Sequence, residues 1–234
     1  FDLAIERARR GTLARMRRSR LLRRRHRAPV ADDLLLAPPD LRPADPSFVD
    51  ETESGSFGLS GLTAHLRGAS LFAVPPPSQA WARELHGFSW LRHFGAAWSV
   101  ENETTARQLV AEWVKGKRRH ADYAWSPEVV GRRIISWLSH AAMILDEAER
   151  RPYAAIMLSL EDQTTYLSAS WRNAPAGYPR LLALIGLTQA GLCIAGHERR
   201  LETAERSLAE ELERQILPDG GPSSRNAWVP VELL

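Results

Sequence analysis

The segment from Trp171 to Tyr178 holds the most promising combination of polar side chains for a binding or catalytic site in this chain. It reads Trp-Arg-Asn-Ala-Pro-Ala-Gly-Tyr and places a guanidinium (Arg172), a carboxamide (Asn173) and a phenol (Tyr178) just ahead of a long apolar run. Groups of this kind at a helix end can hydrogen-bond a polar ligand. The alternative interpretation is a turn between two helices, in which Asn173 bonds to its own backbone.

A second polar segment, residues 217–226, reads Leu-Pro-Asp-Gly-Gly-Pro-Ser-Ser-Arg-Asn. Its paired glycines allow the backbone to approach a ligand closely. We therefore expect Arg225 and Asn226 to contact a ligand at this turn.

Tryptophan is unusually frequent, with eight residues in 234: Trp81, Trp90, Trp98, Trp113, Trp125, Trp137, Trp171 and Trp228. Indole rings stack on sugar faces, and they fill hydrophobic cores equally well when the N–H finds a partner. Trp125 and Trp171 both precede expected helix starts beside polar residues, which makes them the better candidates for ligand binding.

Motifs for metal or cofactor chemistry are absent from the sequence. It contains no HExxH, CxxC or GxSxG motif and no glycine-rich phosphate loop, so we expect no metal and no cofactor. The histidines are isolated or lie among apolar residues, as is typical of surface or core positions. The single cysteine, Cys193, lies in an apolar run and excludes a disulfide framework.

The basic charge of the chain is confined to its N-terminal arm, residues 1–27. This arm holds 11 arginines against Asp2 and Glu6, a local charge of +9. Because the whole chain carries +3, the remaining 207 residues carry −6. A nucleic-acid-binding domain would place its basic stripe on the folded body, so we expect no nucleic acid there. No apolar stretch reaches the roughly 18 residues that a membrane span needs.

Three interpretations of the Arg-rich arm are open. A helix that packs lightly on the body is the commonest outcome for such a charge run. Contact with an anionic membrane surface or nucleic acid is the second. A targeting segment is the third, although no apolar h-region follows the arginines.

The elements that position these residues follow from composition. Residues 28–80 are rich in proline and glycine, which predicts an extended connector with short strands around Phe57–Leu59 and Leu71–Val74. From residue 81 to residue 234, apolar residues recur at helical spacing. A helix is expected to begin at Ser126-Pro127, an N-cap followed by proline, and another at Thr104 or Thr105.

The helical region indicates an all-α fold. Residues 179–195 are apolar nearly all round, which predicts a helix buried on every side, whereas 199–216 is amphipathic and highly charged. A buried helix between half-exposed neighbours favours an α/α toroid of antiparallel helix pairs; a helical solenoid gives a similar alternation. Residues 228–234 resemble the start of a helix, so we expect an incomplete toroid that is cut short at its C-terminal end.

Two strings, Gly87-Phe88-Ser89-Trp90-Leu91-Arg92-His93 and Gln215-Ile216-Leu217-Pro218-Asp219-Gly220-Gly221, resemble heparinase II/III-type polysaccharide lyases of bacteria. The resemblance runs from about residue 31 to the end. It implies a helical toroid followed by a β-sandwich, which is absent from this chain. It also implies an acidic polysaccharide as partner and a periplasmic or cell-envelope location.

The chemistry that this resemblance implies is β-elimination at a uronic acid, in which a carboxamide or imidazole neutralises the substrate carboxylate. Asn173 matches the neutraliser, while Ala174 and Pro222 stand where many relatives have histidine. Arg172, Tyr178 and Arg225 would then contact substrate. Because the catalytic Tyr and His would lie in the missing part, we expect this fragment to be inactive.

Three functional hypotheses follow. The first is a polysaccharide lyase acting on a uronate-containing polymer. The second is a non-catalytic helical protein that binds glycan or a cell-envelope partner. The third is a glycoside hydrolase, which needs two carboxylates about 5–10 Å apart; Asp219 with Glu161 or Asp162 are the candidates.

Overall fold

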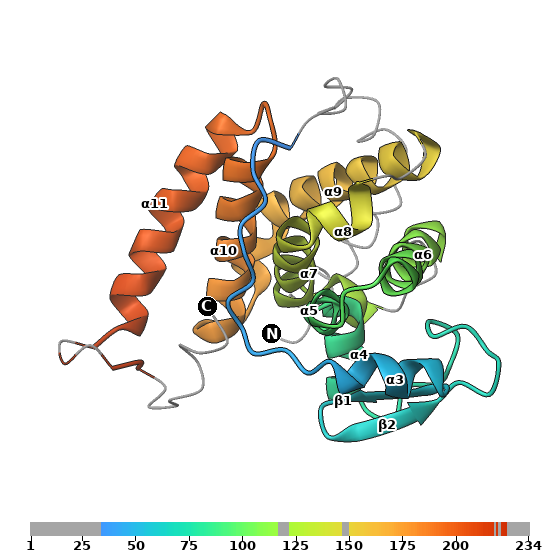
Figure 1. The fold of residues 1–234 in the computed structure, drawn as a ribbon. Coiled ribbons are helices and arrows are strands. Elements are labelled where there is room, and N and C mark those ends of the chain that lie inside the picture. The colour runs from blue at the N-terminus through green and yellow to red at the C-terminus, as the bar shows by residue number, and fades with distance from the viewer. Residues whose placement is uncertain (1–33, 117–121, 147–149, 218, 220, 224–234) are drawn as a thin grey trace.

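The computed structural model describes residues 34–116, 122–146, 150–217, 219 and 221–223. This part of the chain is mostly helical, which confirms the predicted all-α class, and its one sheet has two strands (Figure 1). The elements in chain order are α3 (Ser47–Glu53), β1 (Ser56–Leu59), β2 (Leu62–His65), α4 (Gln79–Gly87), α5 (Leu91–Ala96), α6 (Val100–Gly116), η1 (Asp122–Trp125), α7 (Pro127–Ser139), α8 (Ala141–Leu145), α9 (Arg150–Ser170), η2 (Trp171–Asn173), α10 (Tyr178–Cys193) and α11 (Glu198–Gln215).

The connector predicted for residues 28–80 contains more structure than an extended chain. Strands β1 and β2 form an antiparallel hairpin whose register pairs Leu59 with Leu62. Its two-residue turn has positive φ at Ser60 (50°) and Gly61 (73°), the geometry that matches the twist of the strands. The strand expected at Leu71–Val74 is instead a turn, because no strand among the described residues pairs with it; Leu71 is buried in the core at 2% exposure.

A strap, residues 34–46, runs over the helical body before α3 (Figure 1). It begins beside the end of α10, where Leu34 forms an isolated bridge with Ile194 and the Leu35 amide donates to the Cys193 carbonyl at 2.7 Å. Near α5, the Arg92 guanidinium donates to the Pro43 carbonyl at 2.9 Å. These contacts hold the strap at both ends.

A cluster of aromatic side chains lies in the core, contributed by the hairpin and the segment from α4 to α7. The residues Phe57, Trp81, Phe88, Trp90, Trp113 and Trp137 are each at most 1% exposed. Several of these rings meet edge to face, as in the Phe88–Trp137 and Trp113–Trp137 pairs. Four of the eight tryptophans therefore lie at the centre of the core.

Helix α10 is the buried helix that the sequence predicts. It crosses α7 at Gly131 and Gly186, so closely that a Cβ added to Gly131 would lie 2.4 Å from the Leu182 carbonyl oxygen. On its other side it packs against α11, where Gly191 abuts Leu201. Ile185, Thr188 and Gln189 are half-buried, and Leu192 is 44% exposed.

Helix boundaries differ from the sequence predictions at one notable place. Helix α6 begins at Val100 rather than at Thr104 or Thr105, because the Ser99 hydroxyl accepts from the Asn102 amide at 3.1 Å and caps the helix earlier. The Thr104 hydroxyl bonds to the Val100 carbonyl inside the helix. Helix α7 starts at Pro127 as predicted.

Candidate functional site

The two polar segments singled out in the sequence lie close together, joined through a buried carboxylate on α11. Glu211 is 1% exposed and accepts from the Gly177 amide at 3.3 Å and from Gln215 Nε2 at 3.2 Å. Both arginines contact its second oxygen, Oε2: Arg214 Nη1 donates to it at 3.3 Å, and Arg180 Nη1 lies 3.6 Å from it. Two guanidinium groups thus offset its negative charge, as burial of a carboxylate requires.

Gln215 extends this cluster into the late turn. Its side-chain oxygen accepts from the Ser223 hydroxyl at 2.7 Å, and its carbonyl accepts from the Ser223 amide at 2.7 Å. The same side-chain oxygen would lie 3.5 Å from a Cβ on Gly177, whose φ of +92° favours glycine. The Trp171–Tyr178 segment therefore packs against the last turn of α11 and residues 221–223.

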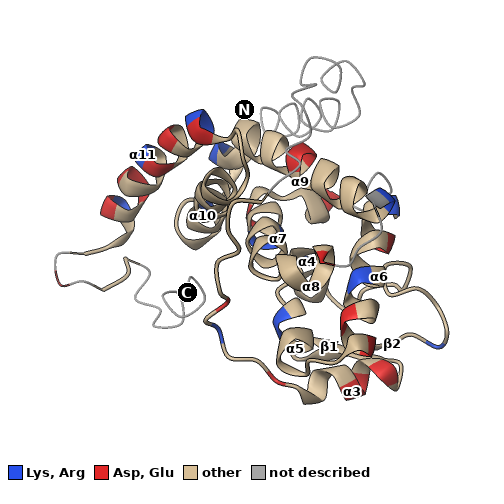
Figure 2. Cartoon of the chain, turned by 45° about the horizontal axis from the view of Figure 1, so that its top comes forward, with Lys and Arg blue, Asp and Glu red and all other residues tan. Residues whose placement is uncertain are grey.

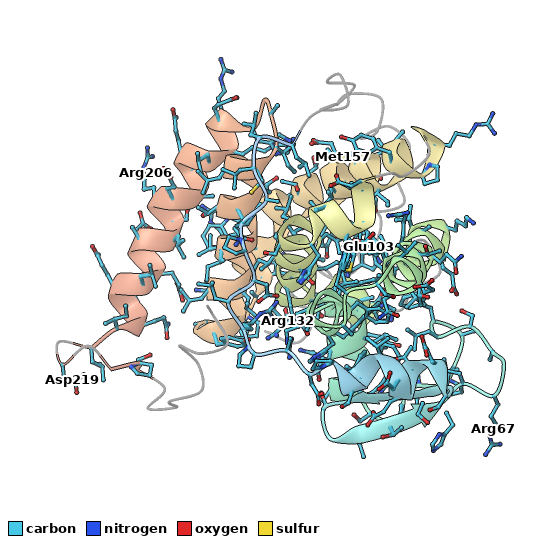
Figure 3. All side chains as sticks on the ribbon, in the orientation of Figure 1. Arg67, Glu103, Arg132, Met157, Arg206 and Asp219 are labelled. Carbon is cyan, nitrogen blue, oxygen red and sulfur yellow. The ribbon has the colours of Figure 1, made fainter. Side chains whose placement is uncertain are left out.

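Tyr178 and Asn173 lie in different surroundings within that segment. The Tyr178 hydroxyl accepts a hydrogen bond from Arg132 of α7, whose guanidinium lies 5.8 Å from the Tyr178 ring centroid (Figure 3 labels Arg132). Asn173 is exposed at the end of η2. Arg172, also exposed, covers the Trp171 ring at 4.2 Å. Trp171 is consequently partly buried against the core, with one face covered by an arginine of its own segment.

Trp125 is 7% exposed and lies inside the aromatic core. Trp113 lies 6.0 Å from it between ring centroids and Tyr166 5.4 Å, while the Arg133 guanidinium is 5.5 Å from its centroid. In this structure Trp125 therefore packs as a core residue. Arg225 and Asn226 lie outside the described residues. Ligand binding by any of the predicted site residues stays a prediction.

Arg133 is a buried cation that no sequence motif indicated. It is fully buried and donates to Gln163 Oε1 at 2.6 Å and to the carbonyls of His86 and Ala124 at 2.7 and 3.0 Å. Its guanidinium lies 4.1 Å from the Trp113 ring centroid. Burial lowers the pKa of Arg133 to about 9, because the charged form loses its hydration. This one side chain connects α4, η1, α6, α7 and α9.

A second network joins α9 to the start of α11. Glu161 lies 2.6 Å from His197 Nε2 and accepts from Arg200 Nη1 at 2.9 Å. Burial acts to raise the pKa of Glu161, but the contacts with His197 and Arg200 outweigh it and lower the pKa to about 2. Its role is therefore an ion-paired tether between helices.

The carboxylate pair required by the glycoside hydrolase hypothesis does not form. Glu161 contacts the N-terminal end of α11 through His197 and Arg200, whereas Asp219 lies beyond the C-terminal end. A helix of 18 residues is about 27 Å long, far beyond a separation of about 5–10 Å.

A surface depression formed by described residues lies elsewhere. It has a volume of about 600 Å³ and is lined by residues 52–55 and 65–69, between the end of α3 and the end of β2. None of the predicted site residues lines it. Across the described ranges, no group of three or more His, Cys, Asp or Glu side chains could hold a metal ion.

None of the described helices combines the length and apolarity that crossing a bilayer requires.

Comparisons with known proteins find a similarity that extends over most of the chain. No family model matches the chain, and no solved structure matches it. The chain is 29% identical over 209 residues to FtsZ-localized protein C of Caulobacter vibrioides (strain NA1000 / CB15N). The match covers 88% of this chain and 36% of the relative, so the chain spans about a third of that protein's length.

This similarity overturns the functional prediction made from sequence. The prediction of a polysaccharide lyase, with a uronate-containing polymer as its substrate, is wrong, because the relative is an FtsZ-localized protein. The predicted role in polysaccharide degradation is wrong for the same reason. The error arose because two short strings were given a catalytic meaning although the histidines at positions 174 and 222 were missing. The resemblance to heparinase II/III proteins itself stays a prediction.

Proposed function

We propose that this chain belongs to a cell-division-associated protein that localises with FtsZ through protein contacts made by its helical body. The observation that carries this proposal is the 209-residue similarity to FtsZ-localized protein C, which extends over 88% of the chain. A similarity of that extent includes most of the helical body rather than a single motif.

Exposed apolar side chains support a protein partner. Trp98 is 71% exposed, Leu41 69%, Val100 67% and Leu35 62%. Isolated exposed apolar residues are ordinary, but a run of them on one extended segment favours an interaction surface. The strap holds three such residues, since Leu36 is also exposed.

The strap also buries a pair of opposite charges and exposes the leucine between them. Asp40 and Arg42 form a salt bridge of 2.6 Å with side chains only 7% and 9% exposed, while Leu41 between them points to solvent. Although partial burial acts to raise the pKa of Asp40, Arg42 lowers it below the usual value. A segment that buries the Asp40–Arg42 pair and exposes Leu35, Leu36 and Leu41 is suited to apolar contact with another protein.

The strongest polar clusters in the described part of the chain serve the fold. Glu211 pairs with Arg180 and Arg214, and Glu161 pairs with His197 and Arg200. Charged groups arranged to neutralise each other hold helices in place. This pattern supports a binding role over a catalytic one.

The proposal is tested by imaging a fluorescent fusion of the full chain together with FtsZ in dividing cells. We expect the two signals to coincide at the division site and the fusion to disperse when FtsZ is depleted. A fusion that stays evenly spread while FtsZ rings are present would refute the proposal.

A pair of variants assigns the contact to the strap. Replacing Leu35 and Leu41 with serine is expected to reduce localisation at least several-fold without loss of helical circular dichroism. Leu158→Ser is the matched control, because Leu158 is 43% exposed on α9, away from the strap.

The finer architecture is also a proposal. We infer that the helices belong to an α/α toroid, because α10 lies between α7 and α11 and gives the alternation of inner and outer helices that such a ring has. An experimental structure in which helix pairs follow α11 around a common axis would support it, and a straight stack of pairs would contradict it.

A further inference from the structure

Helix α11 is covered on one side only. Ala204 and Glu211 are its buried residues, while Leu201, Leu208 and Leu212 are half-buried and Ile216 just beyond its end is 50% exposed. In Figure 1 it lies at the edge of the molecule with α10 as its neighbour. Its apolar face is therefore wider than the surface that α10 covers.

The charges of α11 are sorted into two flanks. An α-helix turns about 100° per residue, and measured from the buried Ala204 this step separates its exposed residues by sign. One side, which we term the acidic flank, consists of Glu198, Glu202, Glu205 and Glu213. The opposite side holds Arg199, Arg200, Arg206 and Arg214, with Glu210 among them. Figure 2 shows both colours along α11, and Figure 3 shows Arg206 pointing away from the body.

The uncovered apolar edge lies on the acidic side. By the same angular step, Leu208, Leu212 and Ile216 fall about 40°, 80° and 120° from Ala204 in the direction of Glu205 and Glu198. This edge of α11 therefore combines half-exposed apolar side chains with carboxylates. A surface of that kind fits a basic amphipathic helix, which supplies apolar contacts and guanidinium groups together.

The chain itself contains a segment of that chemistry. The Arg-rich arm, residues 1–27, carries 11 arginines and a net charge of +9. Its apolar residues are scattered at spacings compatible with a helix: Leu3, Ile5, Leu13, Met16, Leu21 and Leu22. Its charge is opposite to that of the acidic flank.

The attachment point of the arm places it within reach of α11. The described chain starts at Leu34, which bridges to Ile194, and Leu35 bonds to Cys193. The contacted residues, Cys193 and Ile194, precede the start of α11 at Glu198 by only a few positions. Residues 28–33 span at most about 20 Å when extended, while α11 is about 27 Å long. The arm can therefore lie along the acidic flank of its own chain.

We propose that the Arg-rich arm docks along the acidic flank of α11 in the same molecule. Docking pairs its arginines with Glu198, Glu202 and Glu205 and covers the apolar edge at Leu208 and Leu212. This proposal goes beyond localisation with FtsZ and does not depend on it.

The test uses the full chain with a spin label at Ser19→Cys. Cys193 is not labelled, because it is 1% exposed and burial raises the pKa of its thiol to about 11. At low ionic strength we expect the label to tumble at least threefold more slowly than in 1 M NaCl, because salt screens the paired charges.

Charge variants locate the contact. Glu198→Lys, Glu202→Lys and Glu205→Lys together are expected to release the label at low ionic strength. The matched control changes Glu51, Glu53 and Glu101 to Lys, which alters the net charge equally at positions far along the chain from α11. This control should leave the label slow, and circular dichroism confirms that both variants fold.

Four results would overturn the proposal. The first is a label that tumbles rapidly in the unmodified chain at low ionic strength. The second is a label that still tumbles slowly in the variant with Lys at 198, 202 and 205. The third is slowing that grows with protein concentration, which would assign the arm to a second copy. The fourth is slowing that occurs only with vesicles containing anionic lipid, which would assign it to a membrane surface.

Discussion

Two regions of this molecule are built on opposite principles. The aromatic core around Arg133 joins five elements through fully buried side chains, and α7 and α10 meet there backbone to backbone. Helix α11 is instead held at its two ends by charge networks, through Glu161 and His197 at the start and Glu211 near the finish. Its middle is only half-buried. The contrast indicates that the core defines the fold, whereas α11 and the strap present surface for contacts.

The backbone crossing at Gly131 is where the core is expected to be most sensitive. Gly131→Ala would put a Cβ 2.4 Å from the Leu182 carbonyl oxygen and 2.8 Å from Ala183 Cα, so the helices must separate. We expect a loss of about 3 kcal/mol in the free energy of unfolding, measured by urea denaturation. Gly58→Ala is the control, since its nearest neighbours lie at 3.7 Å. Equal stability of both variants would show that α7 and α10 are not in backbone contact.

Arg133 tests whether a buried cation organises the core. Arg133→Met keeps the stem but leaves Gln163 and the carbonyls of His86 and Ala124 without their donor. We expect a loss of about 2 kcal/mol in unfolding free energy, because unsatisfied buried acceptors outweigh the relief of removing a buried charge. The exposed Arg206→Met should change stability by less than about 0.5 kcal/mol. An Arg133→Met variant more stable than the unmodified chain would contradict this expectation.

Acid titration separates the charge-based attachment of α11 from the apolar core. The pKa of Glu161 is about 2 in the folded protein against an ordinary value of 4.5. A carboxyl with a lowered folded pKa stabilises the fold above its unfolded pKa, and that contribution is lost as the pH falls toward the folded pKa. Stability attributable to Glu161, at most about 3 kcal/mol, should therefore disappear between pH 4.5 and 2.

Glu161→Gln makes this prediction specific. The variant should be less stable at pH 7 and should show a shallower decline of unfolding free energy below pH 4.5. Glu53→Gln, at an exposed position of α3, should leave the acid profile unchanged. If Glu161→Gln and the unmodified chain had parallel acid profiles, the His197–Glu161 pair would not contribute to stability.

The sequence was informative where local signals decide the structure. The apolar run at 179–195 predicted α10, and Ser126-Pro127 predicted the start of α7, because helix periodicity and capping act within a few residues. The Leu71–Val74 prediction was wrong because a strand needs a partner edge, which no local pattern specifies. The α/α toroid also depends on contacts between distant helices, and it stays a prediction.

Site residues depend on contacts between distant elements, and these were less predictable. Arg132 and Arg133 are adjacent and chemically identical, yet Arg133 alone is fully buried, because α6 and α9 close around it. Trp125 was ranked as a ligand residue and lies in the core, whereas Trp98, unremarked, is 71% exposed. The lyase prediction failed for a different reason: two short strings can resemble a family although the residues that perform the family's chemistry are missing.

The smallest expected effect is that of shortening the Leu208 side chain in the middle of α11. Leu208→Ala should cost about 1 kcal/mol or less in unfolding free energy, against about 3 kcal/mol for Ile134→Ala, because Leu208 is half-buried and Ile134 is fully buried. Both are measured by urea denaturation of the full chain.

The Leu208 measurement also bears on the Arg-rich arm. If the arm covers the apolar edge, the cost of Leu208→Ala should be larger in the unmodified chain than in the background with Lys at 198, 202 and 205, where the arm is released. A coupling of about 0.5 kcal/mol or more between these changes would join the charge pairing and the apolar contact into one interface. Strict additivity would mean that Leu208 faces α10 alone, and α11 would then keep an uncovered edge in the full chain.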